Sequence, residues 1–229
     1  MMPKKTTQFF NSPKLHGIAK VALARIPAER GDRVGGQSDG LVAVVFAALA
    51  VEAFANELGM LASDEFYWDG RTSPDPSAVA KAYADVEATH GSVLDKLQAF
   101  RQVLADARWP TGCGIFQDVA DLLRLRNELV HLKLDIREGD TASADAGEPP
   151  KIVGQLRSKR ILADDQQPSA ETWTSTVSTW AAGAWACNVA AGIVAETLSL
   201  LPPGELRADA EHYLGRAITG VGRRSPTRG

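Results

Sequence analysis

The sequence has few of the residues that mark disulfide-bonded and zinc-binding proteins. Its 229 residues contain two cysteines, Cys113 and Cys187, with no CxxC pair and no histidine cluster beside either. This argues against a disulfide framework and leaves no structural zinc site. We interpret both thiols as buried and free. No apolar stretch of secretory length lies near residue 1, so we expect a cytoplasmic protein.

The chain also lacks a strong net charge and the motifs of the commonest enzymes. Its net charge is −3, which gives no overall attraction for nucleic acid, so any contact with RNA must come from a local patch. There is no Walker loop, GxGxxG, GxSxG or HExxH. These absences argue against the common nucleotide-binding, hydrolase and zinc-protease classes, and we expect neither a cofactor nor a metal.

No long apolar run is free of polar residues. Residues 41–61 and 177–201 are the two longest apolar runs, and both are rich in alanine. The first run contains Glu52, Asn56 and Glu57, and the second contains Asn188 and Glu196. We therefore interpret both runs as buried helices of a soluble bundle, and we expect no membrane partner.

Helical periodicity dominates what is present, and it predicts an all-α fold, a bundle of four to five main helices. The expected long helices span residues 38–61, 77–107, 114–132 and 169–200, with a kink or split near Gly91. The bundle would occupy residues 37–201. Residues 1–36 would form an irregular segment or a short helix over 14–26, and residues 202–229 a short helix followed by a basic, disordered tail.

A long polar connection separates the last two of these helices. It covers residues 134–168, and residues 140–150 have the composition of a disordered segment. Residues 151–154 suggest a short strand or an extended piece. A connection of this length in a compact domain is usually functional or disordered.

One heptapeptide, residues 125–131, interrupts the leucine-rich helix over 114–132 with Arg126, Asn127 and His131. On an ideal helix a step of four residues turns the side chain by about 40°, and a step of five by about 140°. Asn127 and His131 would therefore share a face, while Arg126 would point away. Convergence of Arg126 and His131 needs a distorted helix end, a second helix or a second copy of the chain.

These residues resemble the signature of the HEPN superfamily, Arg-(polar)-x-x-x-His near a helix end, in order and spacing. The helix that contains residues 49–58 and the long apolar helix downstream add to the resemblance, which covers roughly residues 38 to 200. The resemblance implies a helical bundle, usually dimeric. Many members are metal-independent endoribonucleases in toxin or defence systems, and others are inactive scaffolds. Some members carry a modifiable tyrosine two positions after the histidine, where this chain has Lys133.

Glu52 lies in the middle of the apolar helix over 38–61, and a buried carboxylate must be paired or protonated. Two interpretations are open. Glu52 faces solvent on one stripe with Asn56, or it holds Arg126 in place. The HEPN resemblance favours the second.

The chemistry that the resemblance implies is attack of an RNA 2′-hydroxyl on the adjacent phosphorus. Histidine suits the proton transfers and arginine suits the charged phosphate. We expect a homodimer whose paired Arg126 and His131 line one cleft, with Asn127 orienting phosphate or histidine and Glu52 and Asn56 in support. Weaker candidates for RNA contact are Lys133, Arg137, Arg157, Lys159 and Arg160.

The expected partners are RNA, a second copy of the chain, and an antitoxin or another protein. The alternative is a non-catalytic HEPN-like scaffold that binds a protein partner or a nucleotide. A third interpretation is an unrelated helical bundle with a chance match.

Overall fold

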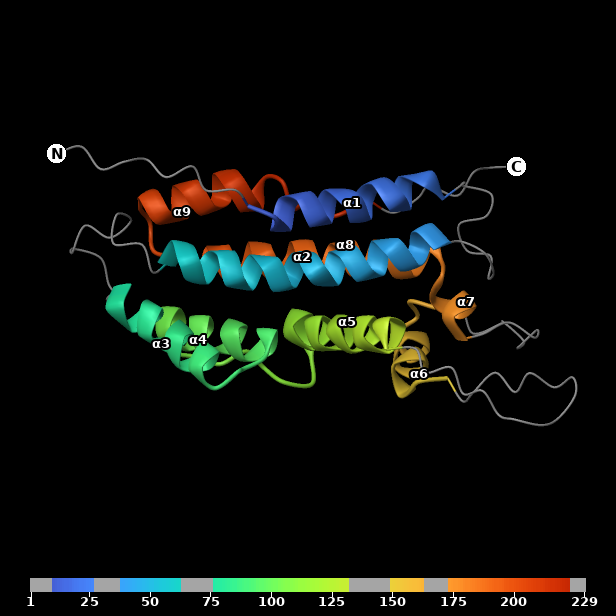
Figure 1. Cartoon of the computed structure of the whole chain (residues 1–229), viewed down its shortest axis with the longest axis horizontal. Helices are drawn as coiled ribbons and strands as arrows, with labels where there is room; N and C mark the ends of the chain where they lie inside the picture. The colour runs from blue at the N-terminus through green and yellow to red at the C-terminus, as the bar shows by residue number, and fades with distance from the viewer. Residues whose placement is uncertain (1–9, 27–37, 63–75, 132–148, 163–172, 223–229) are drawn as a thin grey trace, which may run out of the picture.

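Three layers of helices lie side by side in the computed structural model, which describes residues 10–26, 38–62, 76–131, 149–162 and 173–222 (Figure 1). The central layer consists of α2 (Ser38–Ala62) and α8 (Trp180–Ser199). The described residues contain no strand, which confirms the predicted all-α class.

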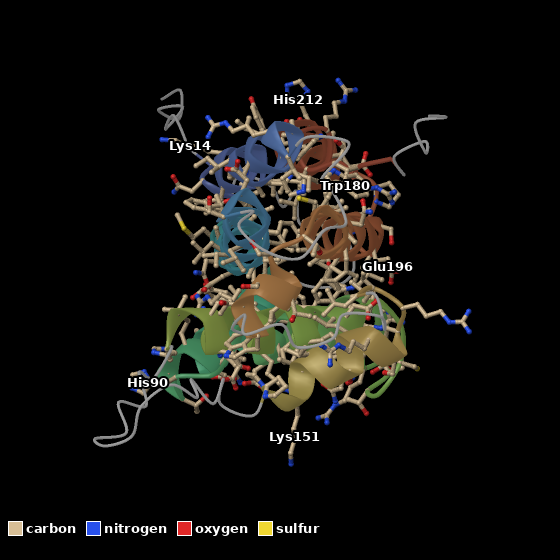
Figure 2. The ribbon with its side chains drawn as sticks, turned by 90° about the vertical axis from the view of Figure 1, so that its right-hand side faces the viewer. Lys14, His90, Lys151, Trp180, Glu196 and His212 are labelled. Carbon is tan, nitrogen blue, oxygen red and sulfur yellow. The ribbon has the colours of Figure 1, made fainter. Side chains whose placement is uncertain are left out.

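The central layer is covered on both sides (Figures 1 and 2). One outer layer contains α1 (Ser12–Arg25), α9 (Glu205–Ala210) and a π-helical turn, η3 (Glu211–Gly215). The other outer layer contains α3 (Pro76–Ala88), α4 (Val93–Ala105), α5 (Gly114–Val130) and α6 (Lys151–Ser158). A short helix, α7 (Trp173–Val177), precedes α8. The predicted helices over 38–61 and 114–132 are confirmed as α2 and α5, and the predicted split near Gly91 is confirmed between α3 and α4.

Small residues bring the helices of the core close together. Five alanines of α2 are at most 1% exposed, and they leave room for the neighbouring helices: Ala43, Ala47, Ala48, Ala50 and Ala55. On α8, a Cβ added at Gly183 would lie 3.0 Å from the Ala43 Cβ, so α2 and α8 approach closely there. A helix with apolar residues around most of its circumference needs such cover on several sides.

By length and composition alone, α2 and α8 are each long enough and apolar enough to cross a membrane. In the most apolar window of each, 56% and 61% of the residues are buried inside the structure. Core helices of soluble proteins pass the same test, so these two helices are weak evidence for a membrane. The cytoplasmic location stays a prediction.

The described part of the leading segment, residues 10–26, contains a helix. Its predicted short helix is confirmed as α1, which packs against α2 and α8 and buries Ala19, Ala22 and Leu23. The carboxylate of Glu57, on α2, accepts hydrogen bonds from the backbone N–H of Ser12 at 3.2 Å and from the Ser12 hydroxyl. Helix α1 therefore belongs to the core of the bundle.

Two expectations about the second half of the chain were wrong. Residues 151–154 are helical and not extended, because Ile152, Val153 and Leu156 form one buried face of α6. The helix expected over residues 169–200 is interrupted between α7 and α8, where the Thr179 hydroxyl accepts from the N–H of Ala182 and caps α8. The start of that predicted helix, residues 169–172, lies outside the described residues.

Both cysteines are free, but only one is buried. Cys187 lies in the core on α8, and burial raises the pKa of its thiol to about 11 although nearby Lys20 lowers it. Cys113 is exposed at the start of α5, so the expectation of two buried thiols was wrong. It sits in a turn whose glycines, Gly112 and Gly114, have positive φ, and such a turn lies at the surface.

Candidate functional site

Helix α5 presents the predicted motif because its other side is anchored in the core. Phe116, Val119, Leu122 and Leu125 recur every three residues and are buried. This face packs against α2 and α8, so the residues on the other side of the helix are left at the surface. Asn127 and His131 are both exposed there.

Arg126 reaches from α5 to Glu52 on α2. Its Nη2 atom forms an ion pair with the Glu52 carboxylate, across 74 residues of sequence. The side chains are 22% and 40% exposed, so the pair lies at the edge of the core, in contact with solvent. Of the two interpretations of Glu52, contact with Arg126 is the one that the structure confirms.

The guanidinium also touches its neighbour in sequence. Arg126 Nη1 donates to Asn127 Oδ1 at 2.9 Å. Adjacent residues on a helix point about 100° apart, so the long arginine side chain bends back to make this contact. Ideal helix geometry predicts that Arg126 points away from Asn127, and this hydrogen bond shows that the guanidinium does not.

His131 ends the helix one turn after Asn127. Its backbone N–H donates to the Asn127 carbonyl at 2.9 Å, and its own φ and ψ, −102° and 33°, are no longer helical. Within the part of the chain that the structure describes, the imidazole has no hydrogen-bond partner and is exposed. No hydrogen bond joins the imidazole to Arg126 within the described residues, so the convergence of the two side chains stays a prediction.

The Asn56 side chain forms no hydrogen bond with Glu52 or Arg126 in the described structure. The prediction that it supports the site beside Glu52 was therefore wrong. Its Oδ1 atom accepts from Lys96 Nζ at 2.6 Å and from the Tyr83 hydroxyl at 3.4 Å. Lys96 also forms an ion pair with Glu87 and lies 5.2 Å from the Tyr83 ring centroid. These contacts join α2 to α3 and α4, away from Arg126.

The weaker candidates for RNA contact have different surroundings. Lys159 is occupied, because its ammonium forms ion pairs with Asp118 and, at 2.8 Å, with Asp121. Burial lowers the pKa of Lys159, but these hydrogen bonds outweigh it and raise the pKa above its usual value. Arg160 is exposed with a φ of 57°, and Arg157 is half-buried. Lys133 and Arg137 lie outside the described residues.

The buried polar residues that were not predicted from the sequence include Asp121, Glu57 and His16. Asp121 is 1% exposed and also accepts from Gln117 Nε2 at 2.9 Å. A signal for it was present, because a carboxylate four residues before Leu125 falls on the buried side of α5. Its role is structural, since it attaches α6 to α5 through Lys159.

The described residues contain no group of three His, Cys, Asp or Glu side chains placed to hold a metal ion. Comparisons of this chain with models of known families, with curated proteins and with solved structures found no match. Function is therefore inferred from the residues themselves and from the HEPN resemblance.

Proposed function

We propose that this protein is a metal-independent endoribonuclease of the HEPN type that acts as a homodimer. One observation carries the proposal: Glu52 and Asn127 contact the Arg126 guanidinium, five residues before the exposed His131 at the end of the same helix. A charged fork and an imidazole at one helix end are the side chains that cleavage through the 2′-hydroxyl requires. The toxin or defence context rests on the resemblance alone.

The reaction has two proton transfers and one phosphorus centre. The 2′-oxygen forms a bond to phosphorus as its proton leaves, and the bond to the 5′-oxygen breaks as that oxygen gains a proton. The products are a 2′,3′-cyclic phosphate and a 5′-hydroxyl. In this proposal the His131 imidazole moves the protons and Arg126 stabilises the charge on the phosphate oxygens.

The Glu52 contact has two effects on Arg126. It fixes the long side chain, which lowers the entropy lost when phosphate binds. It also neutralises the positive charge in part. A guanidinium has five N–H donors, and Glu52 and Asn127 engage only its two terminal nitrogens, one contact each. Donors remain for a phosphate that approaches from the solvent side.

A second copy of the chain would supply a second imidazole, since one His131 cannot easily both accept and donate a proton. Support for a dimer comes from a partly exposed apolar face of α2. Val45, Leu49 and Ala53 are half-buried and lie with Glu52 within an arc of about 100° around the helix. Pairing about a two-fold axis would place this apolar face on itself, with acidic Glu52 and basic Arg126 near the same axis in each copy.

The experiment is cleavage of a mixed RNA pool in EDTA by the purified protein and by His131→Ala. We expect the parent to cut and to leave 2′,3′-cyclic phosphate ends, and the variant to be slower by about a hundredfold or more. His90→Asn is the matched control, because His90 is exposed at the end of α3 with a φ of 53°, which asparagine tolerates. Equal cutting by His131→Ala, or cutting that requires Mg²⁺, would contradict the proposal.

The alternative is a non-catalytic HEPN-like scaffold. The observation that favours it is the same ion pair, because Glu52 offsets the charge of Arg126 and joins α5 to α2 whether or not RNA binds. A folded dimer in which neither the parent nor His131→Ala cuts RNA would support this alternative.

A further inference from the structure

An aromatic cluster lies on the outer layer of the bundle, on the side opposite α5. The π-helical turn η3 carries Tyr213, which is 50% exposed, between exposed His212 and buried Leu214. The Tyr213 ring stacks on Phe10 with centroids 5.7 Å apart and planes at 28°. The His212 ring meets Tyr213 edge-on at 4.9 Å. Tyr213 therefore packs against two aromatic rings while half of its surface remains exposed to solvent.

Cations flank this cluster. Lys14 and Arg216 follow Phe10 and His212, respectively, by four residues, and both cations are exposed. In Figure 2, Lys14 and His212 both lie at the outer surface of this layer. Helix α1 contains Lys14, Lys20 and Arg25 and no acidic residue. This stretch is cationic although the whole chain has a net charge of −3.

Two carboxylates also lie near the aromatic rings. Glu211 is paired with Arg207 at 2.7 Å, so its charge is offset. Asp209 is half-buried, four residues before Tyr213, and is the acidic group that would oppose an anion there. A second copy of this face is a poor partner for it, since Lys14 and Arg216 would meet like charges.

We propose that Phe10, Lys14, His212, Tyr213 and Arg216, the Tyr213 platform, bind single-stranded RNA. A base stacks on the open side of Tyr213, while Lys14 and Arg216 contact the adjacent phosphates. Braced aromatic rings beside cations are how proteins hold single strands without reading their sequence. The choice of RNA as the ligand rests on the proposed function. The platform belongs to the outer layer of α1 and α9, and α5, which carries Arg126, belongs to the opposite outer layer, so the platform would hold the substrate at a distance from the bond that is cut (Figure 1).

The test uses the full chain and a labelled 2′-O-methyl RNA of about 12 nucleotides, within the range of single-strand site sizes. This RNA has no attacking hydroxyl, so its binding is measured whether or not the protein cuts RNA. Tyr213→Ala should raise Kd about fivefold to a hundredfold, and Tyr213→Phe should bind as the parent does because it keeps the ring. Thermal melts of both variants show whether η3 still folds.

The cations are tested with a matched pair of exposed lysines. Lys14→Ala should raise Kd and reduce the slope of log Kd against log salt by about 0.7, the value for one phosphate contact on a single strand. Lys151→Ala should change neither, since Lys151 lies at the opposite end of the molecule (Figure 2). Asp209→Asn should tighten binding, because it removes the opposing charge.

Three results would overturn the platform: no binding by the parent at low salt, an unchanged Kd for folded Tyr213→Ala, or equal losses for Lys14→Ala and Lys151→Ala. Dependence on Lys14 and Tyr213 for binding to phosphatidylserine vesicles, without RNA binding, would assign the face to lipid and overturn it as well. If the parent binds through Tyr213 but cuts no RNA, only the proposed function fails. If it cuts RNA while Tyr213→Ala binds equally, only the platform fails.

Discussion

At the scale of single residues, Glu57 fixes the start of α1. Its carboxylate accepts from the backbone N–H groups of Asn11 and Ser12 and from the Ser12 hydroxyl. The first N–H groups of a helix have no partner within the helix, so this distant carboxylate acts as a cap from another element. Ser12 is 0% exposed, which means that water cannot replace the carboxylate.

We expect Glu57→Ala to lower the free energy of unfolding by about 1–3 kcal/mol, because it leaves buried donors without an acceptor. Denaturant titration measures the loss, and hydrogen exchange should show it concentrated in α1. Glu57→Gln keeps one acceptor oxygen and should lose less. Uniform loss of protection across α2 and α8 would contradict this role.

His16 should make the stability of the protein depend on pH in the acidic range. It is 0% exposed, its Nε2 lies 3.3 Å from the Cys187 carbonyl, and Nδ1 has no partner within the described structure. Burial lowers the pKa of His16 below the usual 6.5, against the bond to Cys187, which raises it, while Lys20 lowers it further. The unfolded chain therefore binds a proton at a higher pH than the folded protein does.

The contribution of His16 to the free energy of unfolding should be constant above pH 6.5. It should fall as the pH drops from 6.5 towards the lowered pKa of His16. The slope from one proton is at most about 1.4 kcal/mol per pH unit. Denaturant titrations of the parent and of His16→Leu between about pH 5 and pH 8 measure it. The difference between the two proteins should depend on pH, and parallel curves would show that His16 does not bind the proton.

The sequence was informative for Glu52 and uninformative for Glu57, although both are carboxylates of one apolar helix. Glu52 had a candidate partner because the motif singled out Arg126. The partners of Glu57 are two backbone N–H groups and the Ser12 hydroxyl, and none of them is a cation that the sequence would mark as the partner of a carboxylate. Asn56 was assigned to the wrong neighbour for a related reason. The spacing of residues shows which face of a helix a side chain lies on, but it does not show which other helix will cover that face.

At the scale of elements, close approach between helices depends on particular glycines. A Cβ at Gly40 would lie 2.8 Å from the backbone N of Thr179 and 2.9 Å from the Ser178 carbonyl carbon. Both are backbone atoms at the break between α7 and α8, so neither can move as a flexible side chain would. The start of α2 thus fits against the turn that begins α8.

We expect Gly40→Ala to destabilise the protein by about 1–3 kcal/mol through this clash. Gly17→Ala is the matched control, because nothing lies within 4 Å of the methyl group that alanine would place on α1. Alanine within a helix is more favourable than glycine by about 0.5–1 kcal/mol, so the control should be stabilising. Thermal melts distinguish the two, and equal shifts in the same direction would show that space at Gly40 is not limiting.

Elements with strong periodicity were predictable, and those defined by tertiary contact were not. The repeat of α5 and the glycine between α3 and α4 are local signals. Helix α6 was not predicted, because Ile152 and Val153 have β-branched side chains that favour strands and only packing on α5 makes them helical. The break at Thr179 lies against Gly40, which is distant in sequence.

At the scale of the whole molecule, the partly exposed apolar face of α2 predicts association. Leu49→Arg places a charge in the middle of this face and should convert a dimer to a monomer at micromolar concentration. Val21→Arg is the matched control, since Val21 is 54% exposed on α1 and lies outside this face. Sedimentation velocity gives the masses, and thermal melts check that both variants fold. A parent that is already monomeric would contradict the dimer, and with it the composite site.

The all-α class followed from periodicity, but the layering did not. Nothing in the sequence indicates that α1 and η3 share a layer, because their contacts join residues nearly 200 positions apart. Lys20 Nζ donates to Thr219 Oγ1 at 2.9 Å across 199 residues. The Tyr213 platform depends on such a contact, between Phe10 and Tyr213, and so could not be found before the structure.

This meeting of distant segments has a consequence for biosynthesis. Translation proceeds from the N-terminus, so α1 and α2 leave the ribosome early, whereas α8 and η3 leave it late. The buried face of α1 packs on both early and late helices: His16 alone contacts a residue 171 positions downstream. During translation that face therefore stays partly uncovered until α8 and η3 have emerged.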